Sequence, residues 1–335
     1  NVRTAVAGAL GQLDREERPA MLAPLIGDDP GWHLSEDAAA DNLGVTYSAL
    51  GFRRTLAVAS ATRIALGAEW QELSLRTAAR RVDASGFGAT IGGWQEAAYG
   101  PFLARLAVEG GAVRYSSAGT LGEGRAALSA WVFAWQATVD YATTPAYPSL
   151  FSVDALLPIG GGQALAERDV AATIGGPIGP LDIGARWQQS LISDGNRRIT
   201  IESYARYALG GDLFAVYSGS GVGFAQRSLL YWDPAQYAAH GVGVEYAVRR
   251  ARGFSFAARV IPTYAWSDES RILPSPDGGF IRDPVTRHRA VQLGAGAEAG
   301  FRVHNWELGG ALSYGRGRAG EYQRFGATVT LRLAP

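Results

Sequence analysis

The chain contains neither cysteine nor lysine, and each absence removes a class of function. Without cysteine there are no disulfides, no thiolate metal sites and no cysteine nucleophile. Without lysine, all 31 basic residues are arginine, and a phosphate-binding loop that ends in Gly-Lys is excluded. Basic and acidic residues balance at a formal net charge of zero, so the basic excess typical of a nucleic-acid-binding protein is missing.

Long apolar runs are also missing. No stretch of about 18 apolar residues occurs, so the sequence predicts no transmembrane helix. A membrane-spanning β-strand needs only about ten residues with every second one apolar, so a barrel of such strands has a nearly neutral mean hydropathy, as this chain has. The chain begins at Asn1 without a charged region followed by an apolar one, so we expect a mature protein or a fragment of a longer one.

The sequence is rich in glycine, tyrosine and tryptophan, and its hydrophobic pattern has a period of two. Only residues 1–30 are spaced for a helix, which Pro30 would end. From about Asn42 onward every second residue tends to be apolar. Since successive side chains of a strand point to opposite faces, each segment has one apolar and one polar face. In 322–333 the apolar face consists of Phe325, Ala327, Val329, Leu331 and Leu333.

The composition of the two faces favours a membrane barrel over a soluble sandwich, whose strands also alternate. The polar face carries glycine, serine, threonine and isolated charges, which suit a water-filled lumen better than a dry core. The apolar face begins or ends in aromatic residues, as an interfacial girdle requires. Such residues are Trp306 with Tyr314, Tyr264 with Trp266, and Trp131 with Tyr141. We expect the lipid-facing band to include Leu293, Phe301, Trp306, Leu308, Val329 and Leu331.

Counting back from the C-terminus gives sixteen strands, which predicts an all-β, transmembrane antiparallel barrel over 42–335 after a helical linker or tail over 1–41. The expected strands are 42–52, 54–66, 71–84, 87–98, 101–117, 125–142, 150–160, 165–176, 181–193, 196–209, 211–224, 237–250, 252–266, 288–303, 305–317 and 320–333.

An even number of strands places both ends of the barrel on one side, normally the periplasm. The tight connections near 210–211, 249–253 and 303–305 then fall on the periplasmic side. The long connections at 160–168, 225–236 and 267–287 fall outside. Short periplasmic turns and long outer loops are typical of bacterial outer-membrane barrels. We therefore predict a location in the outer membrane of a Gram-negative-type bacterium.

Motifs that would indicate catalysis or a cofactor are weak. The strings GSGVG at 219–223 and GAGAEAG at 294–300 resemble dinucleotide-binding loops, but they lack a βαβ context and fall on predicted strands. The four histidines, at 33, 240, 288 and 304, have no metal-type spacing. A barrel lipase would need a Ser–His pair on its outer wall, and nothing in the sequence marks a serine partner for His240. We predict that the chain is not an enzyme and holds neither cofactor nor metal.

Charged residues on the polar faces are the candidate functional residues. In the lumen they would either brace the wall as cross-strand ion pairs or offer hydrogen bonds to a passing solute, and the two roles are compatible. Their mixed signs do not predict strong ion selectivity. The candidate pore-lining or polymer-contacting residues are Arg76, Arg105, Asp140, Arg186, Glu202, Arg206, Glu245, Arg259, Glu298, Arg302, Glu307 and Arg324, with Tyr231 and Trp232 in a loop.

The segment 227–246, RSLLYWDPAQYAAHGVGVEY, carries the most specific motif. Its Tyr-Trp-Asp-Pro run at 231–234, followed by Tyr237 and a glycine-rich strand, resembles a segment in the barrels of exopolysaccharide exporters. These are the cellulose synthase C and poly-N-acetylglucosamine porin families. The resemblance implies a sixteen-stranded barrel that follows a periplasmic array of tetratricopeptide repeats, with 1–41 as the tail of that array or its linker.

The resemblance also implies a function and partners. The chain would export a cellulose-like or amino-sugar polymer from the periplasm, in cellulose biosynthesis or biofilm formation. Its partners would be the exported polysaccharide, outer-membrane lipid, the upstream repeat region and an inner-membrane synthase complex, but no nucleic acid. Two other classes remain open: a general diffusion porin, which would lack upstream repeats, and a surface-lipoprotein translocator barrel, which usually has fewer strands.

Overall fold

In the described residues, sixteen antiparallel strands form one closed barrel. The computed structural model describes residues 30–42, 44–76, 81–146, 164–226, 234–249, 253–269, 272–274, 280–282, 285–317 and 322–333. The barrel strands are β1 (Gly31–Asp41), β2 (Val45–Ala59), β3 (Thr62–Arg76), β4 (Arg81–Tyr99), β5 (Phe102–Tyr115), β6 (Gly119–Val132), β7 (Trp135–Pro145), β8 (Ala166–Ile178), β9 (Leu181–Ile192), β10 (Arg197–Gly210), β11 (Leu213–Phe224), β12 (Gln236–Arg249), β13 (Phe254–Glu269), β16 (Thr286–Val303), β17 (Trp306–Gly317) and β18 (Tyr322–Leu333).

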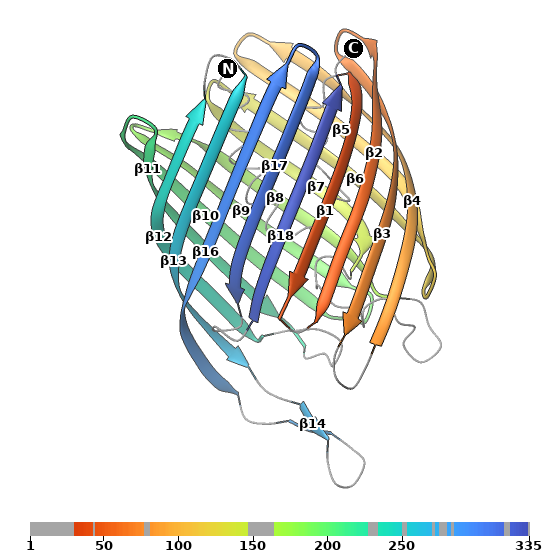
Figure 1. The fold of residues 1–335 in the computed structure, drawn as a ribbon, viewed down its shortest axis with the longest axis vertical. Helices are drawn as coiled ribbons and strands as arrows, with labels where there is room; N and C mark the ends of the chain where they lie inside the picture. Colours follow the sequence, from red (N-terminus) through yellow and green to blue (C-terminus); the bar gives the residue numbers. More distant parts are fainter. Residues whose placement is uncertain are drawn as a thin grey trace.

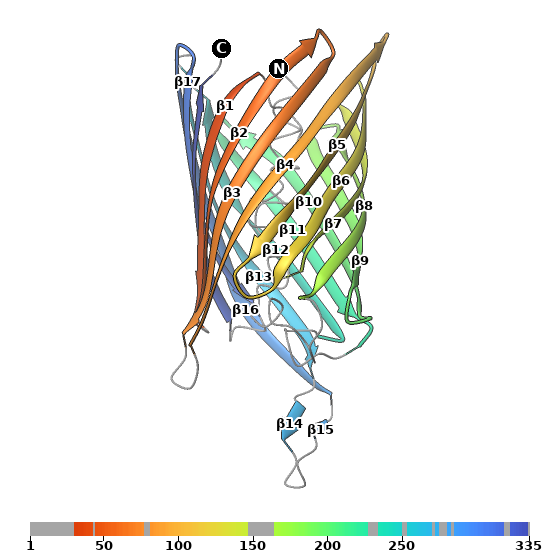
Figure 2. The ribbon, with the colours of Figure 1, turned by 90° about the vertical axis from the view of Figure 1, so that its right-hand side faces the viewer.

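The barrel closes because the first and last strands pair. β1 pairs with β2 on one side and with β18 on the other, so no barrel strand has a free edge (Figures 1 and 2). A closed wall satisfies the backbone hydrogen bonds that lipid cannot satisfy. A separate two-stranded sheet, β14 (Ile272–Pro274) and β15 (Phe280–Arg282), lies beyond one end of the barrel. The described residues contain no helix long and apolar enough to span a membrane.

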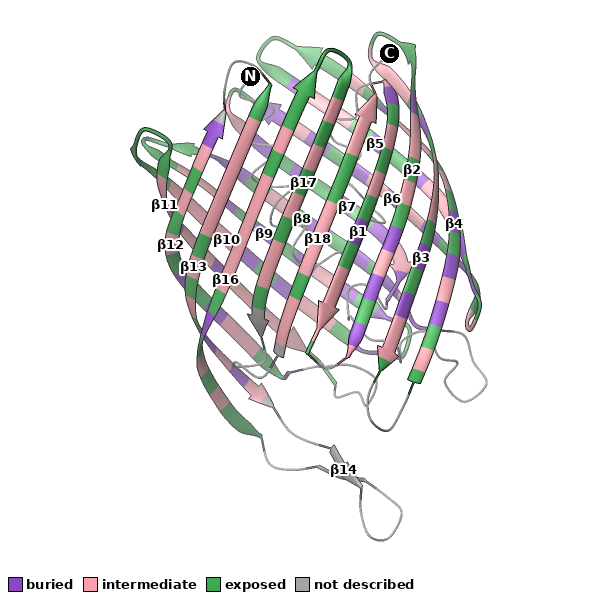
Figure 3. Ribbon diagram, in the orientation of Figure 1, coloured by how far each residue is buried: buried purple, intermediate pink, exposed green. Residues whose placement is uncertain are grey.

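The predicted alternation of side chains is confirmed along the strands, where burial changes from residue to residue (Figure 3). In β9, Arg186, Gln188 and Ser190 are buried inside the barrel, whereas Trp187 and Leu191 are exposed on its outer surface. The period of two in the sequence therefore separates an inner face from an outer face, as a pleated strand requires.

The outer surface carries the predicted apolar band. Five of its six predicted residues are exposed, and Leu331 pairs with the exposed Leu308 on the same face. Aromatic rings meet near both ends of the strands: Trp32 lies 5.1 Å from Phe52, and the ring centroids of another pair, on β17 and β18, lie 4.9 Å apart. An apolar band between two aromatic girdles is the expected surface for a membrane-spanning barrel.

The connections differ between the two ends of the barrel. At the end where β1 begins and β18 ends, which we call the turn end, two residues suffice for several turns, as between Val132 and Trp135 or between Val303 and Trp306. The opposite end, the loop end, bears the connections 146–165, 225–235 and 270–285 and the β14–β15 sheet. The predicted tight connections near 210–211, 249–253 and 303–305 and the long ones at 225–236 and 267–287 are confirmed, whereas the connection predicted at 160–168 spans 146–165.

The barrel begins eleven residues earlier than predicted, because 31–41, assigned to the helical linker, form β1. Trp32 and Leu34 face outward there, but the next outward positions are Glu36 and Ala38, so the apolar alternation is weak. The helix predicted over 1–30 and the strand predicted over 150–160 lie outside the described residues. Predicted breaks at 53, 67–70 and 85–86 fall inside β2, β3 and β4, so several predicted boundaries are wrong. The predicted total of sixteen barrel strands is nevertheless right.

The segment 125–142 is two strands rather than the single predicted one. β6 and β7 meet at the turn Phe133-Ala134, where Phe133 has a φ of 53°. Two-residue hairpin turns favour glycine or asparagine in this conformation, so the sequence gives no signal of the turn. Since the turn changes the parity of the side chains, Trp131 faces the lumen instead of joining Tyr141 on the outer face.

Candidate functional site

The lumen wall contains eleven of the fourteen predicted site residues. The strand registers place them on the inner face, together with buried polar residues such as Gln188 and Ser190. The eleven are Arg105, Asp140, Arg186, Glu202, Arg206, Glu245, Arg259, Glu298, Arg302, Glu307 and Arg324. The predicted loop residues Tyr231 and Trp232 lie outside the described residues.

The prediction that Arg76 lines the pore is wrong. It is exposed on the outer face of β3, the face that carries Leu66 and Trp70. Leu73, an inner-face neighbour, is instead buried in an apolar cluster with Tyr47 and other inner-face residues near the loop end. In this part of the barrel the inner face is as apolar as the outer one, so hydrophobicity alone gives the wrong parity.

The inner face of β5–β10 holds buried ion pairs, and we call it the braced wall. Its centre is Asp140, whose carboxylate lies 3.9 Å from the Arg125 guanidinium and 4.0 Å from that of Arg186. Nearby, Arg198 donates to Glu167 at 2.5 Å. The side chains of all five residues are at most 11% exposed, so these ion pairs are desolvated. They hold the strands in register and leave little charge for a solute.

An arginine and two tryptophans form a second cluster at the turn end of this wall. Arg105 forms an ion pair with Glu96, and its guanidinium lies 5.8 Å from the Trp94 ring and 5.7 Å from the Trp131 ring. Both rings are buried. These cation–π contacts stabilise the positive charge of an inner-face arginine that is largely shielded from water.

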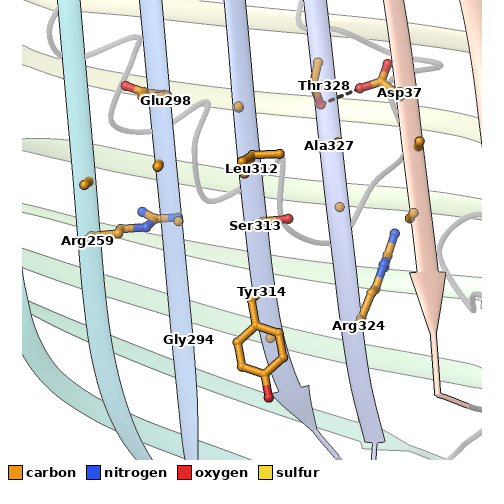
Figure 4. Close-up of a pocket in the computed structure, with 18 of the residues that line it drawn as sticks. Asp37, Arg259, Gly294, Glu298, Leu312, Ser313, Tyr314, Arg324, Ala327 and Thr328 are labelled. Atoms are coloured by element: carbon orange, nitrogen blue, oxygen red, sulfur yellow. Dashed lines mark hydrogen bonds between the residues drawn. The ribbon is translucent and has the colours of Figure 1, made fainter.

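The inner faces of β13, β16, β17, β18 and β1 are different, and we call them the open wall. A cavity of about 290 Å³ lies against them, and Arg259, Glu298 and Arg324 are among its lining residues. Figure 4 shows these side chains on neighbouring strands, with Thr328 donating a hydrogen bond to Asp37 at 2.6 Å. Donors and acceptors therefore alternate around one hollow.

Glycine forms the floor of this cavity. Gly294, Gly296 and Gly315 occupy inner-face positions and line the hollow. A Cβ atom at Gly294 would lie no closer than 3.7 Å to another atom, at Gly296 no closer than 3.5 Å, and at Gly315 nothing lies within 4 Å. The wall has room for larger residues at these positions, so the glycines are not imposed by packing. They keep the lumen wide along the open wall.

Charged groups toward the turn end of the open wall remain accessible. Glu307 pairs with Arg302 at 2.9 Å and lies 3.7 Å from Arg332, and the Arg302 and Glu307 side chains are 56% and 44% exposed. Such exposed pairs contribute little to stability, because water screens them. Their groups are free to exchange hydrogen bonds with a solute, in contrast to those of the braced wall.

One ion pair links β10 of the braced wall to β12, the strand next to the open wall. Arg206 pairs with Glu245 at 2.7 Å and stacks on the Phe214 ring at 3.4 Å. Glu202, another predicted residue, is buried opposite Arg186 in the register of β9 and β10. The structure thus pairs Arg206 with Glu245 across β11 and places Glu202 beside Arg186.

Sequence reasoning missed several inner-face groups, which are Arg53, Glu69, Glu109, Glu123, Arg125, Glu167, Asp169 and Arg198 with the rings of Tyr47 and Trp94. In the sequence of β5, the large apolar residues Leu106 and Val108 alternate with Ala107 and Glu109. This pattern could have identified Glu109 as an inner-face residue. Many inner positions of β2–β6 are apolar, however, which obscures the contrast between the faces. Among the described residues no cluster of histidine, aspartate or glutamate is arranged to hold a metal ion.

Comparison with known proteins shows the fold. No protein-family model and no curated protein matches the sequence. Among solved structures the chain is similar to a bacterial polysaccharide outer membrane secretin, with a TM-score of 0.62 and 10% identity over 92% of this chain and 100% of that one. OccK7 (OpdD) of Pseudomonas aeruginosa has a TM-score of 0.44 and 10% identity, over 91% of this chain and 99% of that one. The likeness to the secretin shows that the chain has the β-barrel fold of outer-membrane proteins.

Proposed function

We propose that the chain is an outer-membrane channel through which an exopolysaccharide leaves the periplasm. The observation that carries the proposal is the open wall, where a glycine floor widens the lumen between accessible arginines and carboxylates. The similarity in fold to a polysaccharide secretin supports this choice of solute, as does the resemblance of the segment at 231–237 to exporter barrels.

The chemistry of the open wall fits a neutral or weakly charged sugar chain. Sugar hydroxyls accept hydrogen bonds from Arg259, Arg302 and Arg324, and they donate hydrogen bonds to Glu298 and Glu307. Because these groups alternate in sign, a polymer finds similar partners at each step. Repeated weak contacts let the polymer move, whereas tight binding would stop it, since conduction requires sites that a solute can leave. No covalent step is involved.

Within the proposal, the polymer enters at the turn end from an inner-membrane synthase complex. Tetratricopeptide repeats, encoded before the barrel in the same gene, would guide it through the periplasm. The alternatives, a general diffusion porin and a surface-lipoprotein translocator, predict no loss of polymer when the lumen is narrowed.

Filling the glycine floor tests the proposal. We expect Gly294→Leu/Gly296→Leu to reduce polymer export strongly, because two leucine side chains would project into the cavity. The matched control is Ala295→Leu/Ala297→Leu, which adds the same two side chains to the outer face of the same strand. Exported polymer is measured in a deletion strain that carries each variant, and barrel folding is checked by heat-modifiable migration in gels.

Two results would contradict the proposal. Normal export by a folded inner-face variant would show that the polymer does not use the open wall. A loss of small-solute permeation, with polymer export unchanged, would favour the diffusion porin.

The orientation in the membrane is tested by an epitope. The β14–β15 sheet lies beyond the loop end, and Asp277 lies between its two strands in the sequence (Figures 1 and 2). If the turn end faces the periplasm, a tag inserted after Asp277 binds antibody on intact cells. Binding only after permeabilisation of the outer membrane would reverse the topology.

A further inference from the structure

The outward-facing arginines are concentrated at the loop end of the barrel. Seven exposed arginines lie there on the outer faces of β3, β4, β5, β8, β10 and β16, and we call them the arginine rim. They are Arg76, Arg81, Arg114, Arg168, Arg197, Arg287 and Arg289. In the turn-end half of the described strands the outward-facing arginine is Arg54, which lies over the Trp32 ring at 4.3 Å.

The rim has more arginine than its own carboxylates neutralise. Asp83 pairs with Arg81 at 2.9 Å, and Asp268 forms two contacts of 2.7 Å with Arg287. Among the described residues no carboxylate lies within ion-pair distance of the other five members, Arg76, Arg114, Arg168, Arg197 and Arg289.

The placement of two rim residues is unfavourable in the protein alone. Arg76 of β3 is directly opposite Arg81 of β4 in the register, and both side chains are exposed on the same face. Like charges at directly opposed positions destabilise a sheet, and Asp83 offsets only one of these two charges. An external anion that binds both guanidinium groups would remove this repulsion.

The position of the rim identifies the anion. Arg114 lies in one cross-strand row with the exposed rings of Phe87 and Trp70, and Arg289 is opposite Trp266. Outward-facing tryptophans mark the level of lipid headgroups. The planar guanidinium binds phosphate through two parallel hydrogen bonds. The rim therefore lies where lipid phosphates meet the barrel.

We propose that the arginine rim binds the phosphates of the multiply phosphorylated, multi-acyl glycolipid of the outer leaflet. Several phosphates on one headgroup can engage neighbouring arginines at once, and each of the pairs Arg76–Arg81 and Arg287–Arg289 includes one arginine with no carboxylate of the described residues within ion-pair distance. Such arginines are nearly absent at the turn end of the described strands. This is the distribution expected if the leaflet at that end consists of a different lipid. This inference rests on the membrane placement in the proposed function, but not on the nature of the exported solute.

The test uses the full chain purified in neutral detergent and three probes: bisphosphorylated lipid A, the same lipid after phosphatase treatment, and phosphatidylglycerol. Bound lipid is measured by native mass spectrometry for wild type, Arg76→Gln/Arg81→Gln, Arg287→Gln/Arg289→Gln and the control Arg54→Gln. Each rim pair should weaken binding of the bisphosphorylated lipid roughly 25-fold, about fivefold for each arginine near an anionic lipid surface. The control should bind as wild type does.

Three results would overturn the inference: unchanged lipid A binding in both rim variants, equal binding of the dephosphorylated lipid, or equally tight binding of phosphatidylglycerol. Heat-modifiable migration confirms that each variant is folded. Without lipid, Arg76→Gln should not lower stability, because it removes a like-charge contact. Lipid binding that does not depend on the rim refutes the lipid site alone, whereas normal export by the glycine-floor variants refutes the exporter and leaves the lipid site standing.

Discussion

Replacing Leu312 by arginine should lower the free energy of unfolding by about 2–4 kcal/mol, the usual cost of a cation on the lipid face near the membrane midplane. Leu312 is 64% exposed on the outer face, in the middle of β17, between Ala297 and Ala327. An arginine there loses its hydration to hydrocarbon. The effect is measured by reversible urea unfolding of the barrel in lipid vesicles, followed by tryptophan fluorescence.

The neighbouring residue supplies the matched control. Ala311 is on the inner face, opposite Glu298 on β16 and Thr328 on β18. An arginine at this position has a carboxylate partner and a polar lumen, so Ala311→Arg should change the free energy of unfolding much less than Leu312→Arg. Equal costs at the two positions, or a larger cost at Ala311, would contradict the assignment of the outer face to lipid.

Asparagine at Asp140 should lower the free energy of unfolding by about 3–5 kcal/mol, the usual cost of removing one partner from a buried ion pair. The Asp140 side chain is 1% exposed and lies between Arg125 and Arg186, which are 6% and 9% exposed. Asparagine keeps the shape but removes the charge, so two buried guanidinium groups lose a nearby negative charge. The same unfolding assay measures the loss.

Two further variants separate this charge effect from a general sensitivity of the fold. Asp212→Asn changes an exposed aspartate in the turn between β10 and β11, and it should be nearly neutral. In Asp140→Asn/Arg186→Gln one of the two cations that face the lost carboxylate is removed, so part of the lost stability should return. If the double variant is less stable than Asp140→Asn, the ion pairs are not what asparagine disrupts.

Local alternation in the sequence was sufficient to establish the class of fold and much of the lumen wall. In the central parts of β16–β18 the inner positions are mostly glycine, alanine, serine, threonine and charged residues, and the outer positions are mostly apolar or aromatic, so the pattern placed Glu298 and Arg324 on the inner face. The reason is that side-chain direction in a strand depends only on the position within that strand. Where one face is polar and the other apolar, a short window of sequence is enough to assign each side chain to a face.

Strand boundaries and contacts between strands became known only from the folded barrel. The turn at Phe133 lacks a turn residue, and the inner face near Leu73 is apolar, so both Trp131 and Arg76 were placed on the wrong face. Which charges meet is also a property of the closed barrel. The Asp140 carboxylate lies within 4.0 Å of arginines from two other strands, and β1 pairs with β18 although the two strands lie near opposite ends of the chain. Those contacts depend on strand register and barrel closure, which join residues far apart in the sequence. They cannot be predicted from the local pattern of the sequence.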